Sequence, residues 1–180
     1  MSLLTDYQRI LKRHAGYSGE IDGDFGPLTL AAAQAYHVGA GRVPPWMLVA
    51  AQEFGVSEIL GPRSNPRIEM YHASTTLGSS PDAVPWCSSF INWCIERVQM
   101  QGTNSAAARS WDKWAKATKP AYGAVATVPR TGGSGRHVFF VAGFTSTHIF
   151  GLGGNQSDQV NVAVYRRPTL TACRLPANWA

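Results

Sequence analysis

The spacing of apolar residues changes once along the chain, and this change constrains the fold more than any other feature. Up to about residue 117, apolar residues recur every three to four positions, as on one face of an α-helix. From residue 120 they alternate with other residues, and short glycine-rich stretches separate the alternating segments. Helices followed by closely linked strands predict an α+β fold, with N-terminal helices packed on an antiparallel sheet of about five strands.

The same patterns predict where the elements and domains lie. Helices are expected over residues 3–15, 27–37, 46–56, 67–77, from Pro85 onward, and over 106–117. Strands are expected over 123–128, 137–144, 147–152, 159–165 and 171–175, with turns at 132–135 and 153–156. A chain of 180 residues can hold one domain with a small appendage. We expect a short helical segment over 1–40, a linker over 41–45 and the main domain over 46–180.

Composition and charge narrow the class of protein. No apolar run approaches the roughly 20 residues that cross a bilayer, so we expect no membrane span. Residues 1–13 lack the apolar core of a secretory signal, so no signal peptide is expected. Residues 101–180 carry 9 Lys and Arg against 2 Asp and Glu, which favours an anionic partner, a merely solvated basic face being the alternative. Nucleic acid is not the expected partner, because no recognised binding motif or dense basic run occurs.

The cysteines are few, and their spacing excludes common metal sites. Cys87, Cys94 and Cys173 form no cluster with zinc-ligand spacing, so we expect no metal and no other cofactor. Cys87 and Cys94 lie about 10 Å apart along one helix, too far for a disulfide. A bond between Cys94 and Cys173 remains an option.

Cys87 lies in the first turn of a predicted helix, within the stretch Pro85-Trp86-Cys87-Ser88-Ser89-Phe90-Ile91-Asn92-Trp93-Cys94. A thiol at a helix N-terminus faces unpaired N–H groups and the positive end of the helix dipole, and both favour the thiolate. We therefore expect the pKa of Cys87 to fall below the free value of about 8.5 and the thiol to be nucleophilic. The alternative is a small buried side chain.

A nucleophilic cysteine needs a base, and His137 is the best placed of the five histidines. It opens a predicted strand, so its ring lies at the rim of the sheet, where a helix packed across the sheet can present Cys87. Asn155 and Gln156 end the next strand, and antiparallel pairing brings that end to His137. Asn155 is the expected group that orients the ring, with Gln156 and Asp158 as rivals. Arg136 adds a neighbouring cation, which we expect to disfavour the protonated ring.

Two stretches resemble known families. The first resembles the peptidoglycan-binding repeat of cell-wall hydrolases, through Gly19, Ile21-Asp22-Gly23, Phe25-Gly26-Pro27, Thr29, Ala32 and Tyr36-His37. Residues 46–176 resemble a papain-like family of cell-wall hydrolases, related to the CHAP and NlpC-type amidases and endopeptidases and found in phage endolysins. The matching residues run in order: Phe54-Gly55-Val56, Gly61-Pro62, Ser64-Asn65-Pro66, Pro85-Trp86-Cys87-Ser88, Asn92-Trp93-Cys94, Gly102-Thr103, Ala108-Arg109-Ser110-Trp111, His137-Val138 and Gly153-Gly154-Asn155-Gln156-Ser157.

The second resemblance implies a papain-like domain in which Cys87 is the nucleophile, His137 the base and Asn155 the group that orients it. The implied enzyme is a monomeric peptidoglycan hydrolase that cuts an amide bond of the stem peptide or the muramoyl–alanine link. Trp86, Trp111 and Gln156 are expected to contact substrate, although core packing is the alternative for the tryptophans. Such an enzyme is made in a host cytoplasm and acts on the cell wall after release.

Two other readings stay open. One is an antibacterial amidase toxin, which has the same chemistry and a different route of delivery. The other is a wall-binding or phage structural module without catalysis. The residues do not decide which amide bond is cut, and they do not decide whether the short N-terminal repeat binds peptidoglycan.

Overall fold

A computed structural model describes residues 2–130 and 135–179 of the chain. The helices are α1 (Leu3–His14), α2 (Pro27–Val38), α3 (Pro45–Gln52), α4 (Pro66–His72) and α5 (Cys87–Arg97), with short 3₁₀ helices η1 (Ala108–Lys113), η2 (Arg167–Thr169) and η3 (Ala177–Trp179). The strands are β1 (Lys116–Ala117), β2 (Val125–Pro129), β3 (Arg136–Phe144), β4 (His148–Gln156), β5 (Gln159–Arg166) and β6 (Ala172–Leu175).

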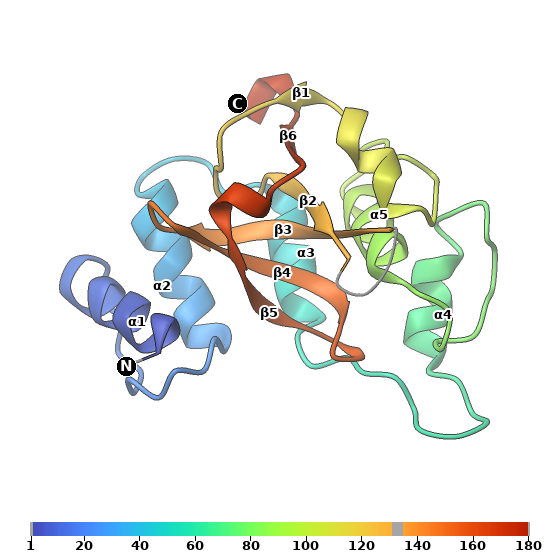
Figure 1. The fold of residues 1–180 in the computed structure, drawn as a ribbon, viewed down its shortest axis with the longest axis horizontal. Helices are drawn as coiled ribbons and strands as arrows, with labels where there is room; N and C mark the ends of the chain where they lie inside the picture. Colours follow the sequence, from blue (N-terminus) through green and yellow to red (C-terminus); the bar gives the residue numbers. More distant parts are fainter. Residues whose placement is uncertain (1, 131–134, 180) are drawn as a thin grey trace.

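The strands form one antiparallel sheet in the order β1-β6-β2-β3-β4-β5. The predicted α+β fold is therefore confirmed, and the five expected strands are β2 to β6. The sixth, β1, has only two residues and was not predicted. In Figure 1 the sheet crosses the middle of the molecule, with α3 behind it and α5 beside α4.

Helix α5 packs on the face of the sheet formed by the middle strands. The ring of Phe90 lies 6.4 Å from that of Phe140 in β3. A Cβ added at Gly154 in β4 would overlap the ring of Trp86, which precedes α5, so glycine at that position permits the close approach. Every residue of α5 from Cys87 to Ile95 is buried. This packing places the start of α5 at the ends of β3 and β4.

The segment over residues 2–40 packs against the same sheet. The ring of Tyr7 in α1 stacks on Phe150 in β4 at 4.1 Å, and Phe25 also contacts Phe150. His37 in α2 stacks on Phe144 in β3 at 4.3 Å. These helices and the strands of the main domain thus contribute to one hydrophobic core. Figure 1 shows α1 and α2 at one end of the sheet and α4 beyond the other.

Some predicted elements differ from the structure. The helix expected over 106–117 is only the 3₁₀ helix η1, and the helix expected over 67–77 ends at His72. Helix α5 begins at Cys87 rather than at Pro85, and residues 153–156, expected to be a turn, belong to β4. Of the turn expected at 132–135, only Gly135 lies within the described residues. In the described ranges no helix is long and apolar enough to cross a membrane.

Candidate active site

Cys87 is the first residue of α5, and its side chain is enclosed between the helix and the sheet. The sulfur faces the backbone N–H groups of Cys87 and Ser88 at the helix start and that of Val138 in β3. Val138 directly follows His137, so the thiol lies against the strand that carries the predicted base. None of the three cysteines forms a disulfide, so the Cys94–Cys173 pair is excluded in this structure.

The prediction of a lowered thiol pKa is wrong. Burial is the dominant influence and raises the pKa of Cys87, because Cys87 is only 7% exposed and a thiolate there loses its hydration. The N–H groups of Val138, Ser88 and Cys87 and the charge of Arg130 act in the opposite direction without reversing it. Sequence spacing identified the helix start and a sheet across from it, but it did not show that this packing buries the thiol.

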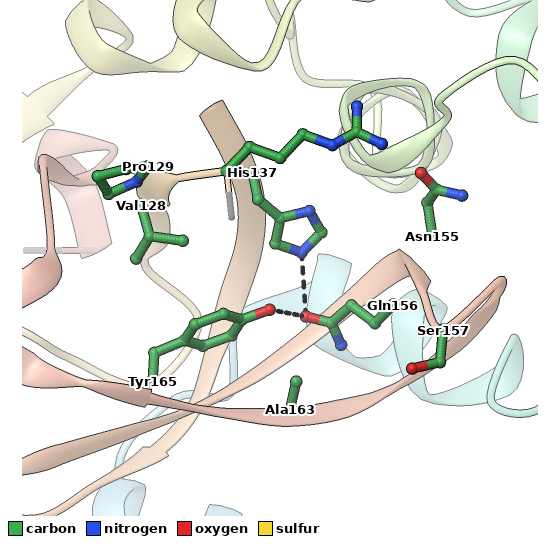
Figure 2. A pocket seen from close by; sticks show the side chains of 9 residues that line it. Val128, Pro129, His137, Asn155, Gln156, Ser157, Ala163 and Tyr165 are labelled. Atoms are coloured by element: carbon green, nitrogen blue, oxygen red, sulfur yellow. Dashed lines mark hydrogen bonds between the residues drawn. The ribbon is translucent and has the colours of Figure 1, made fainter. Parts of the chain in front are cut away.

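The ring of His137 is held by Gln156. Its Nε2 lies 3.1 Å from Gln156 Oε1, which also accepts a hydrogen bond of 2.6 Å from the hydroxyl of Tyr165. The amide nitrogen of Gln156 donates to Gly151 O and Asn161 O, so its oxygen is the atom that faces the ring. Figure 2 shows both dashed contacts meeting at this oxygen. Because that oxygen can only accept, Nε2 carries the proton and Nδ1 has the free lone pair.

Asn155 does not orient the ring, and this prediction is corrected. Its Nδ2 donates to Glu58 Oε1 at 2.8 Å, and Trp86 Nε1 donates to the same oxygen at 2.8 Å. The cause is a bulge in β4, where the register shifts between Gly153 and Gln156 and Asn155 adopts φ +57°. Strict alternation would place residue 155 on the face of His137. The extra residue brings Gln156 there instead.

Asp158, the other rival, lies in the tight turn between β4 and β5. Ser157 and Asp158 both have positive φ, 51° and 61°, and Gln156 pairs with Gln159 across the turn. This is the backbone of a two-residue hairpin turn. The backbone oxygen of Asp158 accepts from the N–H of Glu58 at 2.9 Å, which ties the turn to the loop before α4. Among the described contacts, Asp158 makes no bond to the ring.

The two tryptophans expected to contact substrate are in the core, so that prediction is wrong. Trp86 and Trp111 are both 0% exposed. The indole N–H of Trp111 donates to Ser88 Oγ at 2.9 Å, and this hydroxyl donates to Ser105 O at 2.6 Å. Large rings at these positions fix the start of α5. Gln156 does line the pocket, but its amide is occupied by the contacts described above.

A pocket of about 430 Å³ opens over the ring of His137. Its walls are formed by Val128, Pro129, Arg130, His137, Asn155, Gln156, Ser157, Ala163 and Tyr165. Figure 2 shows the His137 ring and the Tyr165 hydroxyl both pointing toward the side-chain oxygen of Gln156. Among the described lining residues, Arg130 is the one with a permanent charge, whereas Arg136 is turned to Asp112, with 3.4 Å between Nε and Oδ2. The cation near the base is therefore Arg130 and not the predicted Arg136.

Burial lowers the pKa of His137, the bond to Gln156 raises it, and the charge of Arg130 lowers it further, with a net decrease. A neutral thiol and a neutral ring with a free Nδ1 are therefore the resting state near pH 7. Sequence reasoning missed Tyr165 and Arg130. Tyr165 was visible only as an aromatic residue in a predicted strand, and Arg130 only as a cation before a glycine-rich stretch.

The site has a thiol against the N–H of Val138 and, one residue earlier in β3, an imidazole of fixed tautomer held by an amide, and these are the groups that nucleophilic acyl transfer uses. In the described part of the chain, no three His, Cys, Asp or Glu side chains gather as metal ligands would. No family model, no curated protein and no solved structure was found to match the chain.

Proposed function

We propose that this protein is a cysteine-dependent peptidoglycan hydrolase that cuts an amide bond of the stem peptide or the muramoyl–alanine link. One observation carries the proposal. Gln156 holds His137 with Nδ1 free, while the residue next to His137 in β3 contacts the Cys87 sulfur through its N–H. A neutral histidine one residue away from the N–H that contacts the sulfur has the means to take the thiol proton and return it.

The proposed reaction follows from these positions. Nδ1 of His137 takes the proton of Cys87 as the sulfur attacks the amide carbonyl, and the N–H groups at the start of α5 stabilise the oxyanion. The imidazolium then gives its proton to the leaving amine as the carbon–nitrogen bond breaks. Water, deprotonated by the same ring, hydrolyses the thioester and regenerates the thiol. Gln156 keeps Nε2 protonated throughout and so stabilises the imidazolium by a hydrogen bond.

Three features support peptidoglycan as the substrate. The N-terminal segment and the main domain each resemble wall-directed families by the residues given above. The C-terminal half is basic, and wall polymers and stem peptides are anionic. The pocket over His137 has a cation and no acidic side chain in its lining.

The test compares Cys87→Ala with Cys173→Ser on purified sacculi, with release of new amino groups as the readout. We expect Cys87→Ala to abolish release and Cys173→Ser, which alters a thiol in β6 that contacts the backbone oxygen of Lys119, to retain it. Mass spectrometry of the products would identify the bond. Full release by Cys87→Ala would reject the nucleophile. Binding of the wild-type protein to sacculi without any release would favour a wall-binding module.

A further inference from the structure

Arg130 is a charged residue in the wall of the pocket over His137. It directly follows β2, and its backbone N–H donates to Gly135 O at 3.0 Å, which anchors it beside the start of β3. Within the described residues no carboxylate lies within ion-pair distance of its guanidinium, whereas Arg136 is paired with Asp112. The pocket therefore has a cation in its wall without an internal counter-ion.

The charge of Arg130 also acts on both reacting groups. It lowers the pKa of Cys87 and that of His137, so the positive charge of the pocket wall acts on the thiol as well as on the ring. The other described lining groups are the unprotonated imidazole of His137, amides, hydroxyls and apolar side chains, all of them neutral. A ligand with a negative group close to the bond under attack would complement this wall.

We propose that Arg130 determines specificity by binding a substrate carboxylate next to the scissile amide. The substrate class is then a peptide in which the residue beside the cut bond carries a free carboxylate, and the same peptide with a carboxamide there is a poor substrate. A planar guanidinium can hold a carboxylate through two parallel hydrogen bonds, which a lysine cannot reproduce. The peptide substrate rests on the proposed function, but the preference for anions rests on the pocket alone.

The first experiment needs no peptidoglycan. Iodoacetate and iodoacetamide both alkylate a thiolate, forming a carbon–sulfur bond as iodide leaves, and they differ in that only iodoacetate carries a carboxylate. The ratio of their rates at Cys87 is measured by mass spectrometry and normalised to a free thiol. We expect this ratio to fall about tenfold in Arg130→Gln, as for loss of a charge-assisted hydrogen bond. Arg63→Gln, which removes an exposed cation outside the pocket, should leave it unchanged.

An equal ratio in the wild type and Arg130→Gln would overturn the inference. So would a Cys87 that reacts with neither reagent, because the pocket would then not lead to the thiol. Far-UV circular dichroism and tryptophan emission establish that each variant is folded. Arg130→Lys keeps the charge without the planar fork, and an intermediate ratio is expected for it.

The second experiment uses paired stem peptides that differ only in a free carboxylate or a carboxamide beside the scissile amide. The wild type should prefer the free acid by about tenfold or more in kcat/KM, and Arg130→Gln should lose the preference. Hydrolysis of both peptides at equal rates by the wild type would overturn the role of Arg130 and leave the proposed function intact. No hydrolysis of either, with the alkylation ratio still dependent on Arg130, would overturn the proposed function and leave the anion site.

Discussion

At the scale of single residues, the site depends on one amide. Gln156 Oε1 receives hydrogen bonds from His137 and from Tyr165, and its nitrogen is held by backbone oxygens of the sheet. Rotation of this amide by 180° would turn its oxygen toward the carbonyl oxygens of Gly151 and Asn161, which can only accept, so the surroundings determine which atom faces the ring. The tautomer of His137 is thus fixed by the strands β4 and β5.

Replacement of Gln156 should therefore lower kcat more than replacement of Asn155 does. We expect Gln156→Ala to lower kcat about 100-fold, the lower end of what acid–base catalysis contributes, because the ring loses its orientation. Asn155→Ala breaks a bond to Glu58 and not to the ring, so its effect on kcat should be clearly smaller. Steady-state hydrolysis of sacculus fragments measures both. A greater loss in Asn155→Ala would return the orienting role to Asn155.

The direction of the two pKa shifts predicts an unusual pH profile. Burial raises the pKa of Cys87 and lowers that of His137, so no thiolate–imidazolium pair is expected at neutral pH. The value of kcat/KM should rise as the ring loses its proton, with a midpoint below about 6.5. Alkylation of Cys87 by iodoacetamide should keep rising above about pH 8.5. A plateau of alkylation in weakly acidic solution would instead reveal a stable ion pair.

At the scale of elements, the spacing of apolar residues predicted most of the helices and the strands β2 to β6. The same spacing did not predict the local backbone geometry or the burial of individual side chains. Segment 106–117 has helical spacing, yet η1 forms only over Ala108–Lys113. The bulge before Gln156 depends on the positive φ of Asn155, and alternation alone cannot show which of two adjacent amides reaches the ring. Likewise, the sequence placed Cys87 at a helix start, but its pKa depends on the strand packed above it.

The contact between α2 and β3 contains a titratable group. Nε2 of His37 accepts from the Tyr7 hydroxyl at 2.8 Å and from the Phe144 N–H at 3.2 Å, so it must be unprotonated. Burial lowers the pKa of His37 to about 4. The unfolded chain binds this proton near pH 6.5 and the folded chain only near pH 4, so the contribution to stability is present above pH 6.5 and is lost as pH falls.

His37→Gln tests this contribution, because the amide oxygen can accept the same hydrogen bonds and does not titrate. Between pH 7 and pH 4.5 the wild type should lose about 2 kcal/mol more unfolding free energy than His37→Gln, a value reduced for partial solvent access. Urea unfolding at the two pH values measures the difference. The exposed His14 gives the control, since His14→Gln should behave as the wild type. Equal losses in wild type and His37→Gln would contradict the prediction.

At the scale of the whole molecule, residues 1–40 and the sheet are joined by an aromatic contact. Tyr7 is 1% exposed, stacks on Phe150, and lies where a side chain at Gly143 would overlap its ring. Burial of this ring therefore stabilises both the N-terminal helices and the sheet. The sequence indicated an appendage and a linker at 41–45, and periodicity within each segment contains no information about packing between them.

This coupling can be measured because all six tryptophans lie in residues 46–179, so tryptophan emission reports only on the main domain. Tyr7→Ala should lower the unfolding free energy observed by tryptophan emission by about 3 kcal/mol, the cost of removing a large buried ring. Leu28→Ala, at a side chain 60% exposed, should leave it within about 0.5 kcal/mol of the wild type. If the two parts unfold independently, Tyr7→Ala will change the far-UV transition of the N-terminal helices while the tryptophan transition stays in place. A shared core requires instead that both signals shift together, since removing the ring of Tyr7 uncovers Phe150 in the middle of the sheet that positions His137 and Gln156.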